Sequence, residues 1–284
     1  MPRPLPQFAE ELLACPLCAA EVHRAPGALA CASGHSFDTA REGYVNLTTG
    51  RTRHTGDTAE MLTHRSAVHA SGAFQPLVDE IAGTVARHAT SAGTLLEIGA
   101  GDAYYVGELL TSNPGARAVA LDASKHAARR AAAADARIVA VVADAWDAWP
   151  LRSDAIDVVL TAFAPRNPEQ TARVLAPEGI AVVAAAGPDH LAELRGPLGL
   201  LSVQPDKDTR IEERYAAAGL ERIDSRELVW RQILQTGTVR DVALMGPSAF
   251  HTQPDALDSA LEALPAPVAV TFHVQVATFA PIRS

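Results

Sequence analysis

All three cysteines of the chain lie in one short N-terminal segment, in the order Cys15-x2-Cys18-x12-Cys31, and His35 follows the last of them. Structural zinc sites hold the ion with four sulfur or nitrogen ligands in a tetrahedron, and three cysteines with one histidine are a standard set. A disulfide with one spare thiol is the alternative, but an odd number of cysteines fits it poorly. We therefore expect a closed zinc site, which folds a small module and does no chemistry of its own.

A second group of chemically active residues consists of carboxylates and glycines at the ends of predicted strands. The turn Glu97-Ile98-Gly99-Ala100-Gly101-Asp102 follows one strand and opens a helix, and its glycines would let the backbone approach a ligand closely. The next two strands end in Asp122 and Asp144. Because ligands of open α/β sheets bind at the carboxyl ends of the strands, these residues would meet in one crevice. There Asp122 would bind ribose hydroxyls, while Asp144 and the backbone at Ala145 would read an adenine edge.

Two nucleotide cofactors compete for this crevice. A dinucleotide site needs a third glycine where this chain has Tyr104, and the carboxylate of Asp102 would repel a pyrophosphate. S-adenosylmethionine carries a cationic sulfonium and an ammonium group, which suit Glu97 and Asp102. The alternative is that the acids only cap helices, but three acids at matched strand ends favour a ligand. We therefore expect S-adenosylmethionine.

The elements that must position these residues alternate between strands and helices. The pattern predicts strands at 94–98, 116–122, 137–144, 155–163 and 179–186, followed by two more at 227–234 and 268–279. Strands that alternate with helices of about ten residues indicate a doubly wound, parallel α/β sheet. Upstream, Asp57 and Glu60 predict a helix that starts with a capping box, and 75–88 predicts a second helix. We expect a zinc module at 1–47, a linker with helices at 48–90 and the α/β domain at 91–284.

Size, charge and apolar runs restrict the class of protein. With 284 residues, of which 48% are apolar, the chain can bury a sizeable core. Of the net charge of −9, residues 1–75 carry −1 (6 Lys/Arg, 7 Asp/Glu) and the remainder −8, which argues against a non-specific polyanion binder. The N-terminus has no apolar signal region, and runs such as 180–186 are too short to cross a bilayer. We expect no membrane association and a cytoplasmic location, which suits a thiolate metal site.

Sequence segments along nearly the whole chain resemble one known family. They are CPLC (15–18), GHSFDTAREGYVNL (34–47), GDTAEM (56–61), LLEIGAGDAYY (95–105), LDASKHA (121–127), VADAWD (142–147), FAPRNPE (163–169), GPDHLAEL (187–194) and MGPSAFH (245–251). The chain resembles the RlmA-type 23S rRNA guanine-N1 methyltransferases, in the Gram-positive branch that includes the tylosin-resistance enzyme.

This resemblance implies a fold and an activity. The fold is a class I methyltransferase sheet whose last strand is antiparallel. The activity is methyl transfer from S-adenosylmethionine to N1 of one guanine in a 23S rRNA hairpin beside the peptide exit tunnel, and in some members the methyl group contributes to macrolide resistance. By position, the three cysteines and His35 match the zinc ligands. Gly101, Asp102 and His190 match cofactor-contacting residues, and Phe74 stands where the family has a cofactor-contacting tyrosine.

The loop after the fourth strand is the expected methyl-acceptor side of the crevice. Phe163 would stack on a base, and Arg166 or Asn167 would hydrogen-bond its edge. The alternative, of equal weight, is a proline-shaped turn with Phe163 in the core. Phosphate contacts would come from the N-terminal cations Arg24, Arg41, Arg51, Arg53 and His54, although each also fits an ordinary solvated charge.

Several properties stay open at the level of sequence. Guanine N1 must lose a proton, but no general base is identified, since helix capping is the better explanation for both Asp57 and Glu60. A small-molecule or peptide methyltransferase on the same scaffold, and an RNA-binding factor without catalysis, are the alternative functions. The sequence leaves open whether the chain is a monomer or a homodimer.

Overall fold

The computed structural model describes residues 3–50, 56–201, 207–251 and 253–282. Its main feature is an eight-stranded sheet in the order β10-β11-β9-β8-β5-β6-β7-β4. The strands are β4 (Tyr44–Asn46), β5 (Thr94–Ile98), β6 (Arg117–Asp122), β7 (Ile138–Val142), β8 (Ile156–Ala162), β9 (Leu175–Ala186), β10 (Leu220–Leu234) and β11 (Val268–Pro281).

The sheet is parallel from β4 to β9, and β11 pairs antiparallel with both β9 and β10. The predicted parallel α/β sheet with an antiparallel last strand is therefore confirmed. Three differences concern extent. β9 begins at Leu175 and β10 at Leu220, upstream of the predicted 179 and 227, and β4 adds an edge strand from the segment that we assigned to the zinc module.

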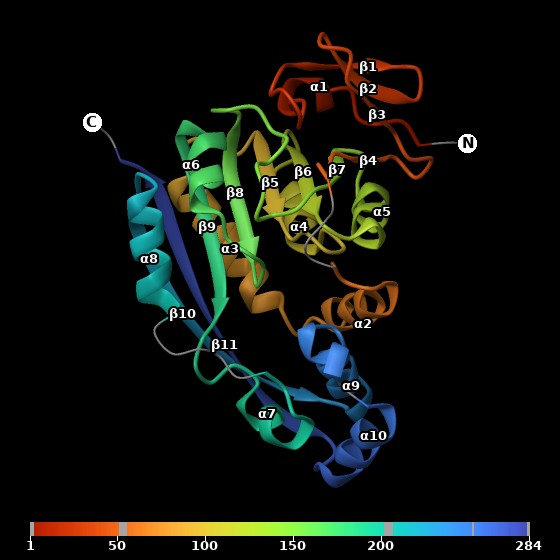
Figure 1. The fold of residues 1–284 in the computed structure, drawn as a ribbon. Coiled ribbons are helices and arrows are strands. Elements are labelled where there is room, and N and C mark those ends of the chain that lie inside the picture. The colour runs from red at the N-terminus through yellow and green to blue at the C-terminus, as the bar shows by residue number, and fades with distance from the viewer. Residues whose placement is uncertain (1–2, 51–55, 202–206, 252, 283–284) are drawn as a thin grey trace.

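Helices cover the two faces of this sheet in separate layers. Leu95 and Val158 face a core cluster formed with α3 (Gln75–His88), α4 (Tyr104–Ser112) and α5 (Lys125–Ala134). Their chain neighbours Leu96 and Val159 face a second cluster, formed with α6 (Pro168–Val174) and α8 (Lys207–Ala217). This alternation follows from the twofold side-chain period of a strand, and it gives the three-layer α/β architecture seen in Figure 1.

The N-terminal module lies at the amino ends of the parallel strands, at the top of Figure 1. It contains α1 (Ala9–Leu12) and a three-stranded antiparallel sheet of β1 (Val22–Ala25), β2 (Ala28–Cys31) and β3 (Ser36–Asp38). Leu13 forms a bridge with Leu151, just before β8, and the ring of Phe8 packs on Arg117, the first residue of β6. In the described structure no helix connects β7 to β8. The apolar side chains of the N-terminal module pack into the second core cluster.

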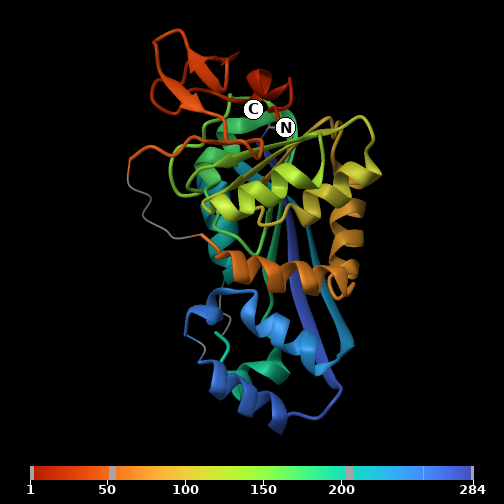
Figure 2. The same ribbon diagram turned by 90° about the vertical axis from the view of Figure 1, so that its right-hand side faces the viewer.

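A separate lobe follows the carboxyl ends of the strands. It consists of α7 (Ala192–Leu198), α9 (Thr236–Leu244), the 3-10 helix η1 (Pro247–His251) and α10 (Pro254–Ala263). Figure 2 shows α2 (Ala59–Ala70) lying across the molecule between the sheet layers and this lobe. His64 of α2 pairs with Asp241 of α9 at 2.7 Å, so α2 ties the two parts together.

The start of α2 corrects one sequence prediction. Its N-cap is Thr58, whose hydroxyl accepts a hydrogen bond from the Met61 N–H, so the predicted cap at Asp57 is wrong by one residue. Asp57 does not cap the helix; its carboxylate forms an ion pair with Arg65. Among the described helices, none combines the length and apolar character that a bilayer-spanning segment requires.

Candidate active site and metal centre

The four predicted zinc ligands converge in the N-terminal module. Their ligand atoms all lie within 4.8 Å of one another. The Sγ atoms of Cys18 and Cys31 are 3.8 Å apart, and Nδ1 of His35 lies 3.4 Å from Sγ of Cys15 and 3.5 Å from Sγ of Cys31. Zinc–sulfur bonds of about 2.3 Å in a tetrahedron require sulfur–sulfur edges of about 3.8 Å, so the spacing fits zinc.

The chemistry of this cluster also suits zinc. None of the three cysteines forms a disulfide. Hydrogen bonds of Cys18 with the backbone at Ala20 and with the Ser33 side chain lower the pKa of its thiol to about 6. A thiolate is the form that ligates the metal. Because all four positions are protein ligands, the cluster is a structural site with no open position for catalysis.

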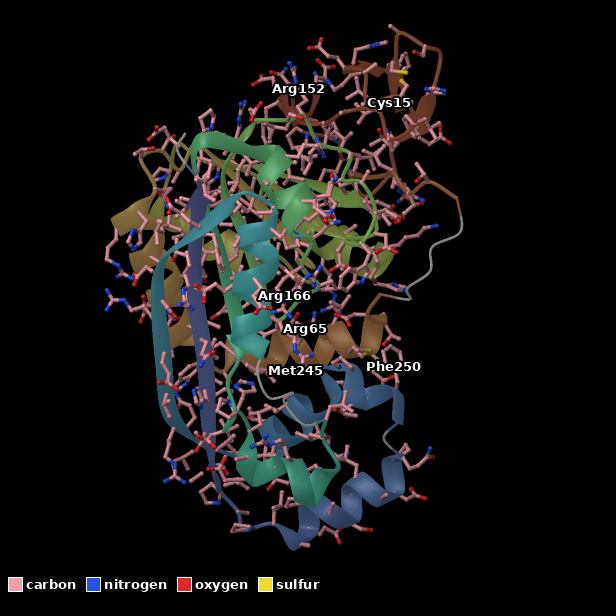
Figure 3. All side chains as sticks on the ribbon, turned by 60° about the vertical axis from the view of Figure 1, so that its left-hand side comes forward. Cys15, Arg65, Arg152, Arg166, Met245 and Phe250 are labelled. Atoms are coloured by element: carbon pink, nitrogen blue, oxygen red, sulfur yellow. The ribbon has the colours of Figure 1, made fainter. Side chains whose placement is uncertain are left out.

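A cavity of about 390 Å³ lies at the other end of the parallel strands from the module. Its walls come from the loops after β5, β6, β7 and β8, from α2, and from residues 245–247 of the C-terminal lobe. Figure 3 shows Cys15 far from Arg65 and Met245, which lie at this cavity. The volume falls in the range of small-molecule sites.

The glycine turn lies at the cavity floor, and its glycines have left-handed backbone conformations. Gly99 has φ +64° and Gly101 has φ +56°. A Cβ on Gly99 would lie 2.5 Å from Cβ of Ala164, and one on Gly101 would lie 2.9 Å from Nη1 of Arg65. A side chain at either position would therefore collide with a residue that lines the cavity, so the turn requires glycine; Gly99 is itself part of the lining, whereas Gly101 lies behind it.

Two strand-end acids hold the backbone around this floor. Oδ2 of Asp122 accepts a hydrogen bond from the Gly101 N–H at 2.9 Å, and Oδ1 accepts one from the Ser124 N–H at 2.8 Å. Burial raises the pKa of Asp122, against the lowering effect of these bonds. Asp144 accepts from the Trp146 N–H at 3.0 Å. Both acids line the cavity, as does Ala145, so the three are brought together as predicted.

Glu97 lies deeper than the other acids. It is 2% exposed, and its Oε2 accepts a hydrogen bond from the Val106 N–H at 3.1 Å. Burial raises the pKa of Glu97 well above its usual value. Its position at the cavity agrees with the prediction, but burial disfavours the negative charge on which we based its role.

Asp102 also lines the cavity, and two residues of α2 hold its carboxylate: Ser66 through a hydrogen bond and His69, whose Nδ1 lies 3.3 Å from Oδ1. Oδ2 of Asp102 accepts from the Ser66 hydroxyl at 2.7 Å. A carboxylate beside the glycine turn would stabilise a cationic ligand group in the cavity.

Aromatic rings form the wall opposite the acids. Phe74 is 2% exposed and packs between Phe272, at 5.1 Å, and Phe163, at 5.8 Å. Phe163 is 42% exposed and has φ +53°, which places it at the cavity and not in the core. The ring of His190 lies 5.6 Å from that of Phe163, and its Nδ1 accepts from the His273 N–H at 3.2 Å.

The remaining predicted substrate residues are placed elsewhere. Asn167 caps α6 and donates its amide to the backbone carbonyls of residues 145–147. Neither Asn167 nor Arg166 is among the residues that line the cavity. Arg24 is exposed and pairs with Glu10 on the module. Arg51, Arg53 and His54 lie outside the described residues.

Sequence reasoning missed several residues that line the cavity, among them the polar side chains Arg65 and His69 of α2. They are four residues apart on α2, a spacing that places side chains on one face of a helix. That spacing was a usable signal. The contact of Arg65 with the Met245 carbonyl (2.8 Å) was not, because it joins segments far apart in the chain.

Two solved structures share the fold of this chain. A protein from Bacillus halodurans reported as a methyltransferase superposes with a TM-score of 0.50 at 13% identity, covering 70% of this chain and 97% of that one. The methyltransferase in a complex with the Trm112 activator of Haloferax volcanii gives 0.50 at 15% identity, covering 81% and 100%. Together with the strand order, they confirm the class I methyltransferase fold.

Sequence comparisons identify the family of this chain. Residues 13–54 match the N-terminal zinc ribbon family described as RlmA, N-terminal, and residues 96–183 match a methyltransferase domain. A 23S rRNA (guanine(748)-N(1))-methyltransferase of Streptomyces fradiae is 40% identical over 92% of this chain and 94% of its own length. A Micromonospora griseorubida protein assigned to the 23S rRNA (guanine-N(1)-)-methyltransferases is 38% identical over 95% and 97%. With such identity along nearly its whole length, the chain belongs to the family of the RlmA-type 23S rRNA (guanine-N1)-methyltransferases.

Proposed function

We propose that this chain transfers a methyl group from S-adenosylmethionine to N1 of a guanine in a hairpin of 23S rRNA. The observation that carries this proposal is the cavity at the carboxyl ends of β5 to β8, in a chain whose family relatives bear that activity in their names. The acidic floor, the glycine turn and the aromatic wall each suit a different part of the reaction.

The cofactor fits the floor of the cavity. The turn lines the cavity with Gly99 and Ala100, and the carboxylate of Asp102, which also lines it, suits a cationic group. Asp122 would bind the ribose, since its carboxylate stands at the end of β6 as in other nucleotide-binding sheets. Asp144 and the backbone at Ala145 would bind the adenine. When bound, S-adenosylmethionine supplies an electrophilic methyl group for an in-line displacement.

Phe163 favours a nucleobase as the methyl acceptor. Its ring is partly exposed at the cavity, and it is held in a backbone conformation that bulky side chains rarely adopt. Such strain tends to persist at functional sites, where surrounding structure enforces it. A guanine in a hairpin must leave its stack to reach this cavity, and an aromatic ring can replace the lost stacking. This supports the acceptor role over the alternative of a core residue.

His190 acts as a hydrogen-bond donor in this arrangement. Its Nδ1 accepts from the His273 N–H, so the neutral ring carries its proton on Nε2. In that tautomer Nε2 cannot accept the N1 proton of guanine. Asp57 is occupied by its ion pair with Arg65. We therefore assign no general base.

The zinc module would contribute to RNA binding from a distance. It lies at the amino ends of the strands, while Gly56 and Asp57, which follow it in the chain, line the cavity. An RNA that touches both must extend along the molecule between them. The predicted phosphate contacts Arg51 and Arg53 belong to the segment that joins the two regions.

The test is methyl transfer from labelled S-adenosylmethionine to unmodified 23S rRNA, followed by mapping of the label. Label on N1 of one guanine supports the proposal. Label found only on small molecules would instead favour a small-molecule methyltransferase, and saturable RNA binding without label would favour a binding factor. An Arg51→Ala/Arg53→Ala variant should weaken RNA binding and flatten its salt dependence, whereas Arg226→Ala/Arg231→Ala on β10 should do neither.

A further inference from the structure

Trp146 is a large aromatic residue at the cavity to which the proposed function gives no role. It follows β7 in the chain and is 47% exposed, while Phe163, which follows β8, is 42% exposed. Both side chains line the cavity. The rings of Phe74 and Tyr105, which line it as well, are buried. Trp146 and Phe163 therefore leave apolar ring surface in water that a flat aromatic ligand would cover.

Hydrogen bonds fix the backbone of the loop that carries Trp146. The Trp146 N–H donates to Oδ1 of Asp144 at 3.0 Å, and the Asp147 N–H donates to the Asp144 carbonyl at 3.2 Å. The indole N–H of Trp149 donates to the Ala145 carbonyl at 3.0 Å. Because the loop is held in this way, the position of Trp146 is largely set before a ligand binds.

Asn167 joins this loop to the segment that carries Phe163. Its Oδ1 accepts a hydrogen bond from the Gln170 N–H at 3.3 Å, which caps α6. Its Nδ2 lies 3.3–3.4 Å from the carbonyl oxygens of residues 145, 146 and 147, which share its two hydrogens. One side chain therefore couples the backbones on which the two exposed rings stand.

The depth of Trp146 in the cavity favours the RNA over the cofactor as its ligand. Asp144 and Ala145, which we propose for the adenine, are buried, whereas the next residue, Trp146, is half-exposed. Its side chain thus lies toward the solvent side of the cavity, where a large substrate enters. A guanine that leaves its stack also exposes one face of the adjacent base, and an aromatic side chain can cover that face. Such stacking accepts any base, since every base has a π face.

We propose that Trp146 stacks on the nucleobase next to the target guanine, and that Asn167 is the positioning residue that holds this second base site beside Phe163. This inference rests on the proposed function, because it requires an RNA acceptor. Phe163 receives the guanine and Trp146 receives its neighbour, so the cavity binds two adjacent unstacked nucleotides.

The test combines a change in the protein with a change in the RNA. The substrate is 23S rRNA in which a ligated synthetic segment supplies the target hairpin, either intact or without the base on the 5′ or the 3′ side of the methylated guanine. For wild-type protein, kcat/KM should fall about fivefold or more on one of the two abasic RNAs. Trp146→Ala should lose a similar factor on intact RNA, and less than about twofold more on that abasic RNA.

Binding of the cofactor product provides an independent readout. Calorimetry should show that Trp146→Ala binds S-adenosylhomocysteine with an affinity within about twofold of wild type. Trp146→Phe keeps a ring, so it should retain most of the activity and the sensitivity to the abasic RNA. Trp146→Leu gives the same comparison as Trp146→Ala if the alanine variant does not fold.

Two more variants separate positioning from stability. Asn167→Asp keeps the oxygen that caps α6 but removes the N–H donors to residues 145–147. It should reduce the sensitivity to the abasic RNA, which a loss of helix stability alone would not do. Ile233→Ala is the matched control, because Ile233 is 64% exposed on β10 and does not line the cavity. It should behave as wild type on all RNAs.

Four results would overturn the inference. Wild-type protein could methylate the intact and both abasic RNAs equally, or Trp146→Ala could keep the full sensitivity to the abasic RNA. Asn167→Asp with unchanged sensitivity would remove its positioning role. A loss of S-adenosylhomocysteine affinity of about tenfold in Trp146→Ala would place the indole on the adenine instead. Wild-type protein that labels no guanine of intact 23S rRNA would remove the proposed function itself, whereas equal activity on all three RNAs would remove only the second base site.

Discussion

Replacement of Phe163 by asparagine should separate stability from activity. The left-handed backbone at φ +53° costs a side chain with a bulky Cβ substituent about 1–2 kcal/mol, and asparagine tolerates that conformation. Full burial of a phenylalanine stabilises by about 1.5–3 kcal/mol. Because 42% of Phe163 is exposed, its loss should cost only about 1–2 kcal/mol. The two effects nearly cancel, so Phe163→Asn should change the free energy of unfolding by less than about 1 kcal/mol.

The activity should respond differently. Stacking of a base on an aromatic ring contributes about 1–3 kcal/mol, so methyl transfer to 23S rRNA should fall at least about fivefold, while the affinity for S-adenosylhomocysteine stays within about twofold. Urea unfolding, filter-based methyl transfer and calorimetry measure the three quantities. Phe272→Ala, at a residue that is 0% exposed, is the control and should cost about 3–5 kcal/mol of stability. A loss above about 3 kcal/mol in Phe163→Asn would refute the backbone argument, and an unchanged methylation rate would refute base stacking.

Three more predictions follow from the described contacts. Cys31→Ser should release zinc, as measured by metal analysis, and abolish rRNA methylation. The affinity for S-adenosylhomocysteine should stay within about twofold of wild type, since the module and the cavity lie at opposite ends of the strands. Retained methylation would contradict a role for the module in the reaction. Gly99→Ala should lower the free energy of unfolding by about 2–4 kcal/mol, because a Cβ would lie 2.5 Å from that of Ala164 at φ +64°; a change below about 0.5 kcal/mol in denaturant would be inconsistent with this packing. Burial raises the pKa of Glu97 in the folded state. Its contribution to the free energy of unfolding is therefore complete below pH 4.5, the ordinary pKa, and is lost as the pH rises toward the pKa in the folded state. Glu97→Gln should therefore gain in melting temperature relative to wild type as pH increases from 4 to 8, and a constant difference would argue against it.

The parts of the fold that could be predicted from sequence depend on local signals. The zinc ligands lie within 21 residues of one another, from Cys15 to His35, and their spacing alone identified them. The strands from β5 to β9 are continuous apolar runs because both of their faces are buried, so they were recognisable as a parallel sheet. The convergence of Asp122 and Asp144 then followed from the topology of such sheets.

The parts that could not be predicted depend on contacts between distant segments. β4 has three residues, too few for a periodic pattern, and it becomes a strand only by pairing with β7. The first half of β10 is mostly exposed at the edge of the sheet, and its charged residues conceal a strand. The spacing of Arg65 and His69 indicates a shared helix face, but only the packing of α2 against the turn that carries Asp102 shows that this face lines the cavity.

The position of the zinc module has a consequence for how the protein is made. Its four ligands are close in sequence, so the metal site can close as soon as that segment leaves the ribosome. The partners that cover the module are synthesised much later, since Leu13 meets Leu151 and Val45 meets Val141. In the interval the nascent chain carries a folded, metal-bound unit with an apolar side that has no cover. Zinc supply during translation, and not only afterwards, should therefore govern how much of the protein reaches its native state.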